Sequence, residues 1–236
     1  MVRDDGADMK LSIVATPIGN LGDVSRRAIE TLQSADIIFC EDTRVAQKLL
    51  SAYGIKKNLE SVHQHTTPFA LKRLFEKATK TAKNIAFVSD AGTPGISDPG
   101  GILVQEALKY FGSDITIEPI PGPSAVTAAL SVCGFQADRY RFLGFIPHKK
   151  GRETFFKNLA QIDETVVFYE STHRIVKTMD SLCKVLGNRR LMVARELTKM
   201  HETLYRGNAC EVSESLKSGI IKGEFVIVIA PKKYEE

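Results

Sequence analysis

Short apolar runs alternate with amphipathic segments along the first 135 residues of the chain. Four of these runs are the length of buried strands, at residues 11–15, 36–40, 85–89 and 115–118. Between them, apolar side chains recur at helical spacing in segments 24–32, 68–80, 102–110 and 124–133, and in one segment that runs through Leu50. Strands that alternate with helices predict a largely parallel, doubly wound α/β sheet.

The pattern changes after the glycine-containing stretch at residues 134–140. Beyond it, strands are predicted at 141–146, 165–169, 191–194, 203–205 and 224–230, with helices at 150–160, 173–186 and 211–217. We therefore expect a flexible tail at residues 1–10, a doubly wound α/β domain at 11–135, and a second α/β domain with a mixed sheet at 136–236.

Three predicted strands of the first domain end in turns that are rich in glycine and proline. These turns are Thr16-Pro17-Ile18-Gly19-Asn20, Asp90-Ala91-Gly92-Thr93-Pro94-Gly95 and Pro119-Ile120-Pro121-Gly122-Pro123. Glycine lets backbone N–H groups approach a ligand closely, and proline fixes the path of the turn. Ligands of open α/β sheets bind outside the carboxyl ends of the strands. The three turns together predict one ligand site at that edge.

Composition narrows the class of protein. A hydrophobic content of 43% and a charged content of 25% are ordinary for a globular domain. No apolar run approaches the ~20 residues that span a bilayer. The tail carries three aspartates and no apolar stretch, which does not fit a secretory signal. The four cysteines are Cys40, Cys133, Cys183 and Cys210, and none forms a C-x-x-C pair. We expect a cytoplasmic protein with free thiols and no metal site.

Positive charge is concentrated after the expected domain boundary. Residues 138–157 hold six basic and two acidic side chains, so their net charge of +4 equals that of the whole chain. Such a basic surface attracts polyanions, and Lys149, Lys150 and Arg152 are the candidate contacts to one. On charge alone, a solvated and flexible loop explains the segment better.

Familiar motifs are absent or incomplete. The first turn lacks G-x-G-x-x-G, and neither a phosphate-binding loop nor H-E-x-x-H occurs. Val126 replaces the last glycine of a nucleophile elbow around Ser124, so this serine is better interpreted as a helix cap or a donor to a ligand. His63 and His65 could place two imidazoles on one face of a strand, but no third metal ligand is near in the sequence.

Charged motifs follow three of the predicted strands. They are Glu41-Asp42-Thr43-Arg44, Tyr169-Glu170-Ser171-Thr172-His173-Arg174 and Arg195-Glu196-Leu197-Thr198-Lys199, with Glu202 nearby. Such residues often cap helices or pair with one another. Their repetition at strand ends makes a functional role about equally favoured.

The motifs resemble those of a family of bacterial small-subunit ribosomal RNA methyltransferases within the tetrapyrrole-methylase superfamily. The resemblance covers residues 11–230 and rests on segments 13–23, 41–44, 88–100, 121–125, 168–174 and 194–199. It implies S-adenosylmethionine-dependent 2′-O-methylation of a cytidine ribose in 16S ribosomal RNA. It also implies two α/β domains with the methyl donor in the interdomain cleft, and a homodimer acting on 16S rRNA or the small ribosomal subunit.

The resemblance also implies which residues bind the donor. They are Pro17, Ala91, Gly92, Thr93, Ile96, Ser124, Ala125, Tyr169, Glu170, Leu197 and Ala230. Two features depart from the family. Thr66-Thr67 replaces an Asn-Glu pair after the histidines, and many members continue into a C-terminal helical domain. RNA binding is then expected to depend more on the core dimer and the basic segment.

Methyl transfer to a ribose hydroxyl requires close approach to the methyl carbon and removal of a proton. Asp42, Glu170 and Glu196 are the candidate bases. Arg44, Arg174 and Lys199 could stabilise the developing negative charge. We favour Glu170 with Arg44 or Arg174, and the alternative is a charged network that braces the domain interface.

Two other functions fit the same sequence. A methylase acting on a tetrapyrrole or another small molecule would share the donor site, but would need a deep apolar acceptor pocket. A non-catalytic RNA-binding assembly protein would retain only the fold.

Overall fold

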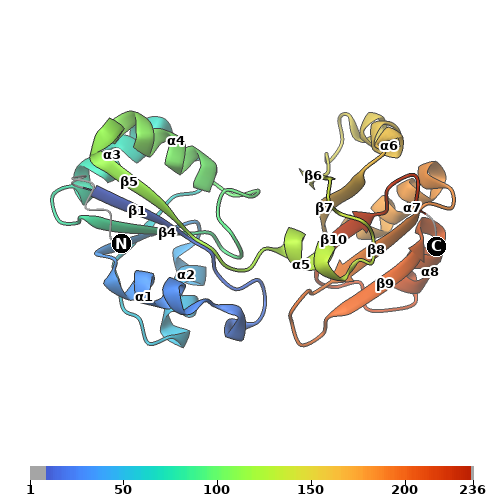
Figure 1. The fold of residues 1–236 in the computed structure, drawn as a ribbon, viewed down its shortest axis with the longest axis horizontal. Coiled ribbons are helices and arrows are strands. Elements are labelled where there is room, and N and C mark those ends of the chain that lie inside the picture. The colour runs from blue at the N-terminus through green and yellow to red at the C-terminus, as the bar shows by residue number, and fades with distance from the viewer. Residues whose placement is uncertain (1–8, 235–236) are drawn as a thin grey trace. The chain divides into compact units, whose positions relative to one another are not determined.

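A computed structural model describes residues 9–234, and its contacts divide the chain into two units between Ser124 and Ala125 (Figure 1). The boundary expected after residue 135 differs from this division by one helix, α5 (Ala125–Val132). Val126 and Ala129 of that helix pack in a core cluster with strands of the second unit, which explains the difference. Residues 1–8 of the expected tail lie outside the described residues, and Met9 and Lys10 begin the first strand.

The first unit is built on a five-stranded sheet in the order β3-β2-β4-β1-β5, with every pairing parallel. Its strands are β1 (Met9–Val14), β2 (Ile37–Cys40), β3 (Leu59–Ser61), β4 (Asn84–Val88) and β5 (Ile115–Ile120). The doubly wound parallel sheet is confirmed. The short edge strand β3 was not expected, because three half-exposed residues give no apolar run.

Helices cover both faces of this sheet. They are α1 (Arg26–Ser34), α2 (Thr43–Ala52), α3 (Pro68–Ala78) and α4 (Gly100–Phe111), with short 3₁₀ turns at Leu21–Asp23 and Gly112–Asp114. On one face α1 and α2 pack against alternate strand residues such as Ile38 and Ala86, and on the other α3 and α4 pack against Phe39 and Phe87. Each fully buried Phe or Leu contributes about 1.5–3 kcal/mol.

The helix starts follow from local chemistry. The side chains of Ser25, Asp42 and Thr67 accept hydrogen bonds from backbone N–H groups in the first turns of α1, α2 and α3. Pro68 occupies the first position of α3, where a missing N–H costs nothing.

The second unit has a mixed five-stranded sheet in the order β6-β7-β10-β8-β9. Its strands are β6 (Tyr140–Phe145), β7 (Thr165–Ser171), β8 (Arg190–Arg195), β9 (Thr203–Asn208) and β10 (Glu224–Ile229). Only β6 and β7 pair in parallel; the other pairings are antiparallel. Helix α5 packs on one face, and α6 (Arg152–Gln161), α7 (Ile175–Leu186) and α8 (Ala209–Lys217) pack on the other.

The expectation of four free thiols is wrong. Helices α7 and α8 pack side by side, and Cys183 forms a disulfide with Cys210 at a Cα–Cα separation of 4.9 Å. Their separation of 27 residues left no motif to signal the pairing. Cys40 and Cys133 are free and buried.

Candidate active site

The three glycine- and proline-rich turns meet in the first unit, as predicted. Thr16 and Gly92 exchange two backbone hydrogen bonds, with N···O distances of 3.0 and 3.1 Å. The Thr93 hydroxyl donates to the Pro123 carbonyl at 2.9 Å. A Cβ on Gly92, whose φ is +82°, would lie 3.2 Å from Ile18 and 3.6 Å from the Pro123 carbonyl oxygen. Gly92 is therefore the point where all three turns pack together.

At the same edge of the sheet, one buried hydroxyl lacks a hydrogen-bond partner within the described part of the chain. Thr16 is 1% exposed, and its hydroxyl has no hydrogen-bond partner among residues 9–234. Buried hydroxyls are normally paired, because desolvating one without a partner costs about 1–3 kcal/mol. An orphaned hydroxyl beside closely packed glycine turns fits a ligand that supplies the missing partner.

The loop after Gly92 is shaped by one carboxylate. Asp98 accepts hydrogen bonds from the N–H groups of Gly95, Ile96 and Gly100 at 2.7–3.2 Å. Ser97 adopts a left-handed φ of 69° inside this turn. The turn leaves the side chain of Ile96 43% exposed, so an apolar group points to the surface beside the glycine turn.

Two further carboxyls lie at the ends of the neighbouring strands β2 and β4. The Asp90 carboxylate accepts a hydrogen bond from the Asp42 N–H at 3.1 Å. Burial and the carboxylate of Asp90 raise the pKa of Glu41. Burial raises the pKa of Asp90 as well; the hydrogen bond from the Asp42 N–H opposes this shift, and the charge of Asp42 adds to it. A carboxyl whose pKa is raised toward neutrality is a better proton acceptor than an ordinary one.

Asp42 and Arg44 are closely paired at the start of α2. The Arg44 guanidinium, followed by its backbone N–H, holds the pKa of Asp42 at about 2. The Asp42 carboxylate also caps the helix through the Arg44 N–H at 2.8 Å. A carboxylate this acidic is a poor base, so the geometry favours Asp42 as an N-cap and Arg44 as an exposed cation.

Three of the predicted donor contacts gather on one face of the second sheet. Ala125, Tyr169 and Leu197 all pack against the same cluster of buried residues. The Tyr169 ring lies between Phe142 and Phe145, at centroid distances of 5.0 and 5.3 Å. This apolar face with one phenol fits the contacts expected for an adenine-bearing ligand.

Ala230 does not join them. Strand β10 is antiparallel to β7, so Phe225 pairs with Glu170 while Ile229 pairs with Val166. Ala230, five residues beyond Phe225, lies about 16 Å along the strand from the Tyr169–Glu170 edge. Its carbonyl accepts from Arg189. Ala230 was expected among the donor contacts, and this register places it away from Tyr169.

Glu170 points to the opposite face of the sheet from Tyr169 and is 1% exposed. Its carboxylate pairs with the Arg174 guanidinium at 2.7 Å and accepts from the Ser171 N–H and the Thr178 hydroxyl at 2.7 and 2.6 Å. Arg152 donates to the same Thr178 hydroxyl at 2.8 Å. These contacts engage both oxygens of the Glu170 carboxylate. The geometry therefore favours a structural network that holds α7 against the sheet, rather than a catalytic base.

Glu196 and Lys199 also belong to a network. The Lys199 ammonium lies 2.9 Å from the carboxylates of both Glu196 and Glu224. Glu196 and Thr198 hold left-handed φ values of 53° and 67°, and the Thr198 hydroxyl is buried without a partner among the described residues. Strained backbone with an orphaned hydroxyl is typical of ligand-contacting loops. The Glu202 carboxylate steadies this loop through the Thr198 N–H.

The remaining candidates separate into exposed and engaged side chains. Lys149 and Lys150 are exposed in the loop before α6, whereas the Arg152 guanidinium donates to the Thr178 hydroxyl and the Pro147 carbonyl. His63 and His65 lie in a turn after β3 rather than in a strand, with ring centroids 6.2 Å apart. The described part of the chain holds no group of three residues arranged to bind a metal.

Sequence reasoning placed Thr16, Asp90 and Glu41 in the turns and the charged motif at the strand ends, but it gave none of them a role and did not single out Asp98. The signal for the first three was present, because each directly follows a predicted strand at the same edge. Asp98 had no such signal, since its role depends on the fold of a loop.

The fold and these turns identify the class of protein. The profile of the family described as Tetrapyrrole (Corrin/Porphyrin) Methylases matches residues 10–213, and the chain belongs to this family. Solved structures with the same fold include cobalt precorrin-4 methyltransferase, with a TM-score of 0.71, 17% identity and 98% of both chains covered. Diphthine synthase has a TM-score of 0.71 at 14% identity, covering 94% of this chain and 90% of its own.

Closer relatives share one particular name. The protein of Thermotoga maritima named ribosomal RNA small subunit methyltransferase I is 39% identical over 95% of this chain and 99% of its own length. Proteins of the same name from Synechocystis and Escherichia coli O157:H7 are 45% and 41% identical, covering 93% and 98% of this chain and 78% and 81% of their own.

The chain is therefore an S-adenosylmethionine-dependent methyltransferase of this family. The orphaned Thr16 hydroxyl and the glycine turn at Gly92 fit a donor bound at the carboxyl edge of the first sheet. Within the described residues, no helix has both the length and the apolar character needed to cross a membrane.

Proposed function

We propose that this enzyme methylates the 2′-hydroxyl of a cytidine ribose in 16S ribosomal RNA. The observation that carries the proposal is identity of 39–45% to proteins named for small-subunit ribosomal RNA methylation, over more than nine-tenths of the chain. The structures of cobalt precorrin-4 methyltransferase and diphthine synthase share the fold at 17% identity or less, which is too distant to assign a substrate. The enzyme would act in the cytoplasm as a homodimer.

S-adenosylmethionine supplies an electrophilic methyl group when it is bound. In the first unit, Pro17, Ala91, Gly92, Thr93 and Ile96 would hold it through the glycine turn and the loop shaped by Asp98. Ser124 ends the third turn and remains a proposed contact. In the second unit, Ala125, Tyr169 and Leu197 are proposed donor contacts, because they share one apolar face.

Asp90 is the proposed acceptor of the ribose proton, with Glu41 beside it. Asp90 directly precedes the donor turn at Ala91–Gly92, and its side chain is exposed. Partial burial of the carboxyl raises its pKa. Arg44 belongs to the same motif as Glu41, and its side chain is highly exposed. It is available to contact a phosphate or the developing negative charge. Glu170 with Arg174, and Glu196 with Lys199, would hold the second unit's loops in position.

The decisive experiment incubates the protein with labelled donor and small ribosomal subunits from a strain that lacks the modification. The expected product is labelled 2′-O-methylcytidine in 16S RNA. Binding of the donor without transfer to RNA would reject the proposal. Transfer to a tetrapyrrole instead would support the small-molecule alternative, and no transfer to any acceptor would support a non-catalytic assembly role.

A further inference from the structure

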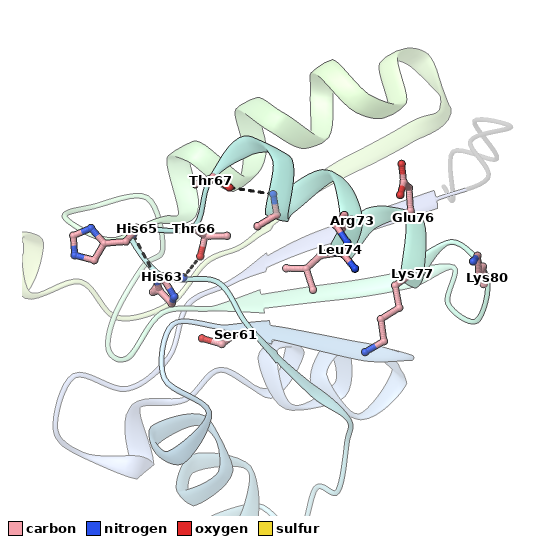
Figure 2. A pocket seen from close by; sticks show the side chains of 11 residues that line it. Ser61, His63, His65, Thr66, Thr67, Arg73, Leu74, Glu76, Lys77 and Lys80 are labelled. Atoms are coloured by element: carbon pink, nitrogen blue, oxygen red, sulfur yellow. Dashed lines mark hydrogen bonds between the residues drawn. The ribbon is translucent and has the colours of Figure 1, made fainter.

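A groove on the first unit, outside the donor turns, is lined by polar and basic side chains (Figure 2). It lies between β3 with its following turn and one face of α3, and has a volume of about 780 Å³. His63 and His65 lie at one end, Lys80 lies at the other, and Arg73 and Lys77 lie between them. We call this feature the α3 groove.

The basic residues of the groove form a row. Arg73 and Lys77 are four residues apart on α3 and share one side of the helix, and Lys80 lies in the turn just after the helix ends. The Lys77 ammonium is held by the Glu60 carboxylate. Arg73 and Lys80 are exposed and form no ion pair with any residue in 9–234. Two cations without partners, in a groove that also holds hydroxyl and imidazole groups and one carboxylate, that of Glu76, complement a chain of phosphates.

An exposed aromatic ring lies beside the row. Phe69, in the first turn of α3, is 70% exposed and precedes Arg73 by four residues, so both occupy the same side of the helix. Aromatic rings next to basic side chains are the usual platform for unpaired bases, since a base stacks on the ring while its phosphates meet the cations.

The β3 wall of the groove is hydrogen-bonded to the segment that holds Glu41. The Ser61 hydroxyl, on this wall, donates to the Glu41 carbonyl at 3.1 Å, and the Val62 N–H donates to the Cys40 carbonyl at 2.8 Å. These bonds fix the start of the groove beside the Glu41-Asp42-Thr43-Arg44 motif. An RNA strand in the groove would therefore pass beside the end of β2, where Glu41 lies.

We propose that the α3 groove binds a single-stranded segment of the RNA substrate that flanks the methylated nucleotide. Arg73 and Lys80 contact its phosphates, and Phe69 stacks on one of its bases. This inference rests on the proposed function, since it takes the substrate to be RNA.

The test compares three variants of the full-length protein. R73Q/K80Q removes the two unpaired cations, F69A removes the ring, and K48Q/K72Q is a control with the same charge change at exposed lysines of the first unit that do not line the groove. Binding of a 16S RNA fragment containing the target is measured over a salt series. Methyl transfer to small subunits, donor affinity and sedimentation are measured on the same samples.

We expect R73Q/K80Q to weaken RNA binding at least about tenfold near 0.1 M salt and to lower the salt slope by about 1.4, at ~0.7 per phosphate contact. F69A should weaken binding about fivefold or more with an unchanged slope. Donor affinity should stay as in the wild type for all three variants.

Equal RNA affinity and slope in R73Q/K80Q and K48Q/K72Q would overturn the inference. A changed sedimentation coefficient of F69A with unaltered RNA binding would instead assign the groove to self-association. Failure of the proposed function would be distinguishable from failure of this inference. In that case the wild-type protein itself would bind the donor and transfer no methyl group to small subunits.

Discussion

At the scale of single residues, the site is defined by which carboxyls are free to act. Asp90 is exposed and carries a raised pKa, whereas Glu170 is enclosed by Arg174, Ser171 and Thr178. The two residues have the same chemistry and both follow strands. Their surroundings, rather than their position in a motif, make Asp90 the candidate base and Glu170 a structural residue.

Replacing Asp90 with asparagine should slow methyl transfer more than tenfold while donor affinity changes only a few-fold. The amide oxygen can still accept the Asp42 N–H, but it cannot take a proton. In the wild type, the rate should rise as pH increases through the raised pKa of Asp90, and the D90N variant should lack this rise. Single-turnover rates over a pH series provide the measurement.

The same variant should not lose stability at neutral pH. A raised pKa in the folded state favours the protonated carboxyl, so the stability it contributes is present below the unfolded pKa of about 3.9 and is lost as pH rises through the folded pKa. Removing the charge therefore carries no penalty at pH 7. D36N, at the opposite edge of the sheet, is the control for rate, and normal turnover by D90N would exclude Asp90 as the base.

Replacing Glu170 with glutamine should lower the free energy of unfolding by about 3 kcal/mol, because the half-buried Arg174 loses its opposite charge. Chemical denaturation monitored by circular dichroism measures this change. A variant that is as stable as the wild type but loses more than tenfold in methyl-transfer rate would restore Glu170 as the candidate base. T178V, which removes one hydrogen bond to Glu170, should show a smaller loss of stability in the same direction.

At the scale of elements, the second unit is fastened by a covalent link between α7 and α8. The double variant C183S/C210S should lower the free energy of unfolding by about 3 kcal/mol, since the disulfide closes a loop of 27 residues in the unfolded chain. Urea unfolding with and without a reductant measures the effect.

Thiol titration of the unfolded protein is the matching control. Without a reductant, only Cys40 and Cys133 should react, and four reactive thiols would contradict the disulfide. In the folded protein both should be inert. Burial, followed by the charges of Asp90, Asp42 and Glu60, raises the pKa of Cys40 to about 12, so its reactive thiolate is scarce.

Elements with strong apolar periodicity were predicted well. The helix at 68–80 and the strand at 85–89 correspond to α3 and β4 within two residues at each end, because their buried faces are continuous in sequence. Strand β3 was missed, since its three residues are stabilised by pairing with β2 rather than by burial of an apolar face.

At the scale of the whole molecule, RNA binding is expected from both units. In the second unit, K149Q/K150Q should weaken RNA binding and lower the salt slope by about 1.4, as both lysines are exposed in the loop before α6. Filter binding over a salt series measures this, with K48Q/K72Q as the charge-matched control. An unchanged salt slope would show that this loop does not contact the RNA phosphates.

Replacement of Arg152 is expected to have a different effect from replacement of Lys149 and Lys150. Its guanidinium is engaged by Thr178 and Pro147, and burial lowers its pKa. R152Q is therefore expected to reduce stability more than it reduces the salt dependence of RNA binding.

The chain's own pattern determined the doubly wound sheet, the mixed second sheet and the three turns that meet at Gly92. These features depend on local periodicity, on the conformational freedom of glycine and on the rule that parallel strands end at one edge. The tertiary structure alone decided that Ala230 lies away from Tyr169, that Cys183 meets Cys210, and that Glu170 is enclosed while Asp90 is exposed. Those outcomes depend on strand direction, register and helix packing, which bring together residues that no local pattern relates.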